Sequence, residues 1–146
     1  MPELLDLYGK TTKAVQAATD AALRRQGLRL GQDHLLAELW RADGRTPGEI
    51  AGAVGVTTPA VTKTASVLEN AGLLVRRPDS RDGRLVRLWL TDAGRALQGP
   101  VEGERQGLDD ALTASLTAEE REVLLKALST LRRVATDLLS LEPKDR

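Results

Sequence analysis

Cysteine is absent from this sequence of 146 residues, and histidine occurs once, as His34. Without cysteine there is no disulfide, no thiolate metal ligand and no thiol redox switch. A single imidazole argues against a metal site built mainly from histidines, and against a nucleophile activated by a histidine base. No glycine-rich phosphate loop follows a strand. We therefore expect no metal, no cofactor and no enzymatic activity.

Long hydrophobic runs are also missing. No segment approaches the roughly 18 apolar residues that span a bilayer. The first ten residues contain acids and lack the basic-then-apolar order of a signal peptide. We expect a cytoplasmic protein with no membrane contact. Aromatic residues make up only 2% of the chain, so the core must consist of leucine, valine, alanine and isoleucine.

The net charge is zero, but the charges are unevenly distributed. Residues 57–95 carry seven basic and four acidic side chains, a surplus of three positive charges, whereas residues 96–146 carry seven basic and ten acidic ones. Binding to phosphates depends on local potential more than on the total. The middle of the chain is therefore the candidate region for a polyanionic partner.

Hydrophobic spacing predicts a mainly α-helical chain with one small β-hairpin. Helices are expected at about residues 4–26, 31–42, 47–54, 58–70, 93–112 and from 118 onwards. Period-two alternation predicts strands at 73–75 and 84–90, and Asp82-Gly83 in the connection is a dipeptide common in hairpins.

Threonines precede several predicted helices. Thr46 with Pro47 and Glu49 suggests a capping box, and Thr117 suggests another. Thr58-Pro59 repeats the threonine–proline pattern, so Thr58 is predicted to be an N-cap. Gly99-Pro100 should bend the helix that contains it, because proline lacks an N–H group and clashes with the preceding turn.

Two short helices joined at a glycine and followed by a hairpin are typical of a winged helix-turn-helix. Ala51 is expected at the contact between the two helices, Gly55 at a turn with positive φ, and Val61 facing inward. Two ordinary packed helices would explain the same spacing, so this signal is moderately specific.

The outward side of the second helix carries short hydrogen-bonding groups, a methyl group and one cation. Such a surface can approach base edges closely, because threonine donates or accepts, alanine contacts a thymine methyl and lysine reaches guanine or phosphate. A capping role is the simpler reading of Thr58, whereas Lys63 has no evident structural task. The predicted DNA-facing residues of this helix are Thr57, Thr58, Pro59, Ala60, Thr62 and Lys63.

The hairpin connection is rich in arginine. Between Arg76 and Arg87 there are five arginines and two aspartates. A solvated, charge-rich loop is the bland interpretation. Five unneutralised guanidinium groups repel one another without an anion, however, and the guanidinium fork suits phosphates and narrow minor grooves. Asp82 is placed to pair with Arg84 and orient it.

Four segments give the chain its resemblance to a known family. They read TPAVTK at 58–63, LENAGLL at 68–74, RPDSRDGR at 77–84 and LTDAG at 90–94. In order and spacing they resemble the MarR (multiple antibiotic resistance regulator) family of bacterial transcription regulators, and the flanking helices match in number.

This resemblance implies a homodimeric regulator, usually a repressor, that binds double-stranded DNA at a pseudo-palindromic operator. Residues 31–92 would form the winged helix-turn-helix of a single domain, and 1–30 with 93–146 the dimerisation helices. By position, Arg84 would enter the minor groove, held by Asp82. Arg76, Arg77 and Arg81 would contact the DNA backbone.

Many members of this family release DNA when a small anionic or phenolic effector binds. Simpler structural roles exist for each candidate here, and Trp89 departs from the charged or polar residue usual at its position. The expected effector residues are Tyr8, Thr12, His34, Glu38, Trp40 and Trp89. The competing interpretation of the whole chain is a winged-helix module that binds protein instead of DNA.

Overall fold

The computed structural model describes residues 2–142, which divide into two compact units on either side of Leu108. Residue 1 and residues 143–146, the outer ends of the predicted dimerisation regions, lie outside the described residues. Within the described part of the chain, no helix is long and apolar enough to cross a membrane.

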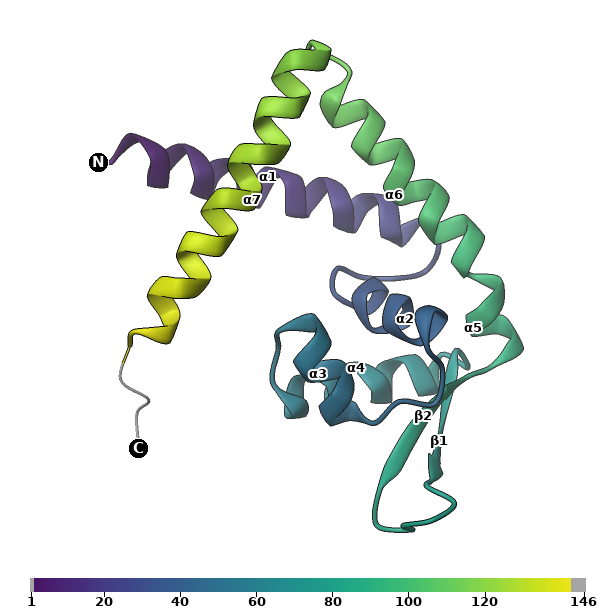
Figure 1. Ribbon diagram of the computed structural model, residues 1–146. Coiled ribbons are helices and arrows are strands. Elements are labelled where there is room, and N and C mark those ends of the chain that lie inside the picture. Colours follow the sequence, from purple (N-terminus) through teal and green to yellow (C-terminus); the bar gives the residue numbers. More distant parts are fainter. Residues whose placement is uncertain (1, 143–146) are drawn as a thin grey trace. The chain divides into compact units, whose positions relative to one another are not determined.

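The predicted fold class is confirmed: helices dominate and a two-stranded antiparallel hairpin is inserted between the fourth and fifth of them (Figure 1). The elements are α1 (Glu3–Arg24), α2 (Gln32–Arg41), α3 (Pro47–Val54), α4 (Thr58–Asn70), β1 (Leu74–Pro78), β2 (Val86–Leu90), α5 (Asp92–Ala96), α6 (Gln98–Thr113) and α7 (Ala118–Ser140).

The core of the first unit is almost entirely aliphatic, as the scarcity of aromatic residues requires. Leu36, Ile50, Ala65 and Leu88, from α2, α3, α4 and β2, are completely buried. Their burial fixes the relative orientation of the helices and the hairpin, because close-packed side chains resist sliding.

The predicted helix-turn-helix is confirmed in its details. Ala51 and Val61 are buried where α3 meets α4. Gly55 ends α3 with φ of 83°, a conformation that glycine adopts without steric cost.

Both strands differ from their predicted bounds. β1 extends to Pro78, through the first two arginines, and β2 begins at Val86, two residues later than expected. Arg77 pairs with Arg87, and Pro78 with Val86. The connection therefore spans 79–85. Asp82-Gly83 lies within this connection, as predicted.

A short segment lies along the other edge of β2. The amide of Gly44 donates to the carbonyl of Leu88 (3.0 Å), and the amide of Leu88 donates to the carbonyl of Arg45 (2.9 Å). The base of the hairpin is therefore attached to the α2–α3 connection.

Thr57, and not Thr58, caps α4. The hydroxyl oxygen of Thr57 accepts from the amide of Ala60 (3.2 Å), and Thr58 is the first helical residue. The prediction was wrong by one residue because proline is tolerated at either of the first two helical positions. Thr46 caps α3 as expected. The capping box lacks its second hydrogen bond, because the carboxylate of Glu49 lies near Arg45 and Arg87 and does not accept from the amide of Thr46.

The predicted interruption near Pro100 is confirmed. The helix breaks at Leu97, between α5 and α6, where the carbonyl four residues before Pro100 would face a ring instead of an N–H group. Just before the break, a Cβ on Gly94 would lie 2.0 Å from the carbonyl oxygen of Leu73. Glycine is therefore required for α5 to approach the connection between α4 and β1 so closely.

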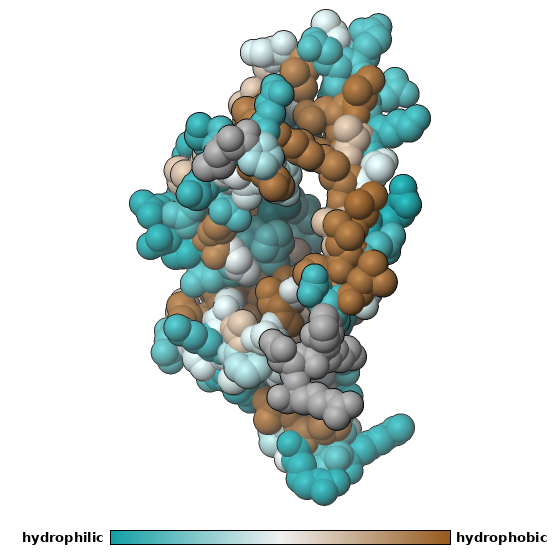
Figure 2. Space-filling model, turned by 90° about the vertical axis from the view of Figure 1, so that its left-hand side faces the viewer, coloured by the Kyte–Doolittle hydropathy of each residue, from teal (hydrophilic) through white to brown (hydrophobic). Residues whose placement is uncertain are grey.

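The second unit contains α7, which begins with the predicted capping box between Thr117 and Glu120. No residue of α7 is buried in the single chain. One side of the helix is apolar, and Figure 2 shows hydrophobic side chains exposed in a stripe on the surface. The exposed apolar residues of α7 include Leu124, Leu128, Leu131 and Leu138.

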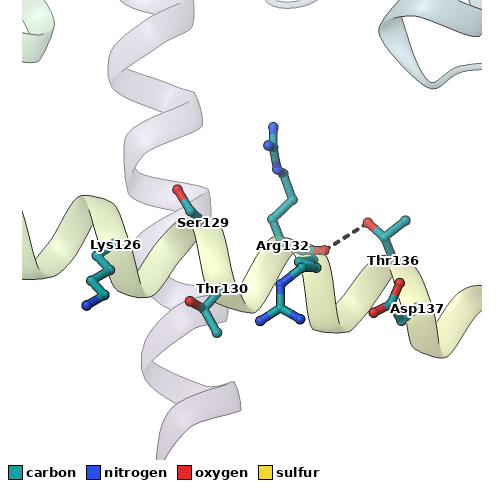
Figure 3. A pocket seen from close by; sticks show the side chains of 7 residues that line it. Lys126, Ser129, Thr130, Arg132, Thr136 and Asp137 are labelled. Carbon is teal, nitrogen blue, oxygen red and sulfur yellow. Dashed lines mark hydrogen bonds between the residues drawn. The ribbon is translucent and has the colours of Figure 1, made fainter.

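The other side of α7 is polar. A shallow depression there is lined only by side chains of this helix, and Thr136 donates to the carbonyl of Arg132 (2.8 Å; Figure 3). Lys126 and Thr130 lie on the same side. The helix is therefore amphipathic, with one face suited to water and one that is not.

Candidate nucleic-acid interface

The first turns of α4 present a polar surface to solvent. Each of the six DNA-facing residues predicted on this helix is exposed, whereas Val61, Ala65 and Leu68 on the opposite side are buried. The core contacts of α4 therefore hold this surface in a fixed orientation, as recognition of base edges would require.

Hydroxyl groups on this surface are partly engaged. Thr62 donates to the carbonyl of Thr58 (3.1 Å), which leaves its oxygen able to accept. Thr57 is used as the cap. The ammonium group of Lys63 has no polar partner among residues 2–142 and lies at the surface, so an anion can bind it without displacing a protein contact.

Asp79 organises the hairpin connection. Its carboxylate accepts from the amides of Arg81 (3.0 Å) and Asp82 (2.9 Å) and from Nε of Arg87 (2.6 Å). These contacts, the hydrogen bond from Arg87 first among them, lower the pKa of Asp79 to about 2. The sequence analysis did not predict this role of Asp79. An aspartate whose carboxylate accepts hydrogen bonds from the amides two and three residues later is nevertheless a common turn pattern.

Asp82 holds Arg84, as predicted. Its carboxylate accepts from Nε (3.1 Å) and from the backbone amide (3.1 Å) of Arg84. The first of these hydrogen bonds is the main reason that the pKa of Asp82 is lowered. The side chain of Arg84 remains 92% exposed, so Asp82 orients its guanidinium while leaving it open to solvent.

Arg76 faces the body of the unit. Its guanidinium bonds to Glu69 (2.9 Å), to the carbonyl of Thr62 (2.9 Å) and to the hydroxyl of Ser66 (2.8 Å). These contacts join β1 to α4 directly. The expectation of five unneutralised arginines was therefore wrong, because Glu69 lies outside the hairpin segment on which that expectation was based.

Two arginines of the hairpin have no such partner. The side chains of Arg77 and Arg81 are exposed and make no hydrogen bond or ion pair with the described part of the chain. Together with Arg84, they form a cationic edge on a hairpin that projects beyond α3 and α4 (Figure 1). An edge of this kind attracts a polyanion.

The six expected effector residues are not gathered in one site. Trp40 donates from Nε1 to the carbonyl of Gly94 (2.9 Å), Glu38 pairs with Arg41 and Arg45, and Trp89 lies against Gly44.

Tyr8 and Thr12 belong to α1, and Tyr8 is 52% exposed. Only His34, among the six, lines the small cleft of about 130 Å³ between α2, α3 and α4. The other walls of this cleft include Ile50, Val54 and Val61.

Comparison with known proteins identifies the family. A family model described as "MarR family" matches residues 28–86. The chain is 32% identical over 111 residues to the HTH-type transcriptional repressor Rv2887 of Mycobacterium tuberculosis, a match that covers 76% of this chain and 80% of that protein. The chain belongs to the MarR family.

Two other similar proteins extend the comparison. The uncharacterised HTH-type transcriptional regulator YdgJ of Bacillus subtilis is 29% identical over 106 residues, 73% of this chain and 65% of its own length. The crystal structure of a MepR–DNA complex from S. aureus superimposes with a TM-score of 0.79 at 25% identity, covering 88% of this chain and 95% of that one. The protein is thus a transcriptional regulator of the MarR family, a family of regulators and not of enzymes.

Proposed function

We propose that this MarR-family chain is a homodimeric repressor that binds double-stranded DNA sequence-specifically at a pseudo-palindromic operator. It would act in the cytoplasm. The observation that carries the proposal is the pairing of two exposed surfaces on one packed unit: the short polar side chains at the start of α4, and the cationic edge of the hairpin.

In this proposal α4 enters the major groove. The small side chains of Thr58, Ala60 and Thr62 allow the helix backbone to approach base edges, where hydroxyl and methyl groups distinguish base pairs. Thr57 and Pro59 would border this contact. Lys63 would reach guanine or a phosphate, since its ammonium group is not otherwise used.

The hairpin would lie over the adjacent minor groove. Arg84 would enter the groove with Asp82 orienting its guanidinium, and Arg77 and Arg81 would contact phosphates. Arg76 would contribute through its position, since its guanidinium already bonds to α4. A phosphate contact from Arg76 would use the N–H groups that Glu69, Thr62 and Ser66 leave unbonded.

The winged helix-turn-helix would span residues 31–92 of a single domain, flanked by dimerisation helices at 1–30 and 93–146. Exposed leucines support this assignment. In α1, Leu4, Leu5 and Leu7 are 58%, 68% and 64% exposed, and α7 has no buried residue. Apolar surface of this extent in a regulator of this family is best covered by a second copy of the chain.

The proposed effector is a small anionic or phenolic molecule. His34 is the best remaining candidate contact, because it lines an apolar cleft beside α4 and has no polar partner among residues 2–142. A thermal-shift screen of such compounds, with His34→Ala as the comparison, tests this directly.

The function is tested by selecting bound sequences from random duplex DNA and then measuring affinity against salt concentration. We expect a palindromic consensus. Arg84→Ala should lower affinity and reduce the slope of log K against log salt by about one, because one phosphate-region contact is lost. Lys63→Ala should also change the preferred bases.

Failure would take distinct forms. An unchanged slope for Arg84→Ala would remove that residue from the interface, and equal loss on all sequences for Lys63→Ala would assign it to phosphate. A protein that binds no duplex even at low salt would contradict the proposal and favour the protein-binding winged-helix module.

A further inference from the structure

Five charged side chains of alternating sign connect α2 to the start of the 79–85 connection of the hairpin. We call this set the charge ladder: Glu38, Arg45, Glu49, Arg87 and Asp79. Arg45 pairs with Glu38 and lies 3.9 Å from Glu49, while Arg87 lies 3.8 Å from Glu49 and 2.6 Å from Asp79. The ladder therefore runs through α2, α3 and the hairpin.

Arg87 is the member of the ladder that joins the hairpin to the helices. Its Nε donates to Oδ1 of Asp79, and its Nη1 donates to the carbonyl of Gly44 at 2.9 Å. Asp79 in turn holds the backbone of the connection. The pKa of Arg87 is raised, chiefly by its hydrogen bond to Asp79, so the bridge stays charged.

Such a bridge matters because an isolated two-stranded hairpin is at best marginally stable in water. Here the base of the hairpin is attached through Gly44 and Arg45 alongside β2, but the connection at 79–85 lies beyond these bonds. The two hydrogen bonds of Arg87 restrain that distal part. These two hydrogen bonds use Nε and Nη1 of one planar guanidinium group, which lysine does not have.

We propose that Arg87 is a positioning residue that sets the offset between the minor-groove arginine of the hairpin and α4. The inference rests on the proposed function. In this role Arg87 acts through Asp79 and Gly44, which hold Nε and one N–H of Nη1, and its remaining N–H groups need no contact with DNA. The alternative is that Arg87 is one more phosphate contact.

Three variants separate these roles on the full chain bound to its selected duplex. Arg87→Gln removes both the charge and the planar guanidinium group, whereas Arg87→Lys keeps only the charge. Arg77→Gln is the matched control, because Arg77 lies opposite Arg87 in the strand register and its side chain has no polar partner among residues 2–142. Hydroxyl-radical footprinting reads the minor groove, and methylation protection of guanine reads the major groove.

We expect Arg87→Gln and Arg87→Lys to lose minor-groove protection while keeping major-groove protection, with affinity about tenfold weaker. Arg77→Gln should keep both protections and lose about one from the salt slope. In the absence of DNA, the amide of Asp79, which donates to the carbonyl of Leu85 (2.8 Å), should exchange faster in both Arg87 variants.

The outcomes are distinguishable. If Arg87→Lys kept minor-groove protection, or if Arg87→Gln behaved like Arg77→Gln, Arg87 would be a phosphate contact. Either result would overturn this inference and leave the proposed function standing. Unchanged footprints and unchanged amide exchange would overturn it as well. If the unaltered protein protected neither groove of any duplex, the proposed function and this inference would fall together.

Discussion

At the scale of single residues, the hairpin connection depends on one carboxylate. Asp79 accepts three hydrogen bonds and has a pKa of about 2 in the folded protein, against 3.8 as its ordinary value. Because the folded pKa is the lower one, its contribution to stability is fully present above about pH 4 and is lost as the pH falls towards 2.

Asp79→Asn should therefore destabilise the protein at neutral pH and change its acid response. The difference in urea midpoint between the two proteins is expected to be clear at about pH 6 and to shrink towards about pH 2, where the native aspartate also becomes protonated. Ser80→Ala, an exposed neighbour, serves as the control. A difference that stayed constant across this range would show that the charge of Asp79 is irrelevant.

Gly94 gives a second prediction at this scale. Gly94→Ala should cost about 1–3 kcal/mol or more, because its methyl group would overlap the carbonyl of Leu73 and neither backbone can move freely. Gly99→Ala is the matched control: it is also helical and a Cβ there meets nothing within 4 Å, so stability should rise by up to about 1 kcal/mol. Equal effects in thermal unfolding would contradict the packing argument.

At the scale of elements, the start of α4 distinguishes two adjacent threonines. Thr57→Ala removes the cap and should cost about 1 kcal/mol, whereas Thr58→Ala should change stability by less than about 0.5 kcal/mol. Chemical denaturation without DNA measures both. If Thr58→Ala were the more damaging substitution, the cap would lie where the sequence pattern first suggested.

Elements that depend on nearby residues were predictable from the sequence. The threonine–proline pairs at their starts and the glycines after their ends located α3 and α4, and the positive φ of Gly55 follows from its place between them. The pairing of Asp82 with Arg84 was also predictable, because the two residues are two positions apart.

Contacts between different elements were not predictable in this way. Arg76 bonds to Glu69 and Arg87 bonds to Gly44, and neither pairing follows from periodicity or from a turn motif. The charge of the hairpin was therefore overestimated from composition alone. Two of the expected effector residues likewise have partners that were not predicted: Trp40 bonds to the carbonyl of Gly94, 54 residues away, and Glu38 pairs with Arg45 beyond the end of α2.

At the scale of the whole molecule, the apolar side of α7 predicts self-association. Leu128→Glu should shift the protein towards monomers, because a charge would replace a leucine in the proposed interface. Thr130→Glu places the same charge on the polar side of the same helix (Figure 3) and should leave the mass unchanged. Light scattering at micromolar concentration measures both, and a monomeric mass for the unaltered chain would contradict the dimer.

The contact between Trp89 and Gly44 has an optical consequence. The chain has only two tryptophans, and Trp40 is held by its bond to the carbonyl of Gly94. Trp89 is 38% exposed at the base of the hairpin, beside the glycine whose carbonyl accepts from Arg87. With Trp40 replaced by phenylalanine, the emission of a single native indole would report bending of the hairpin in real time, without any attached dye.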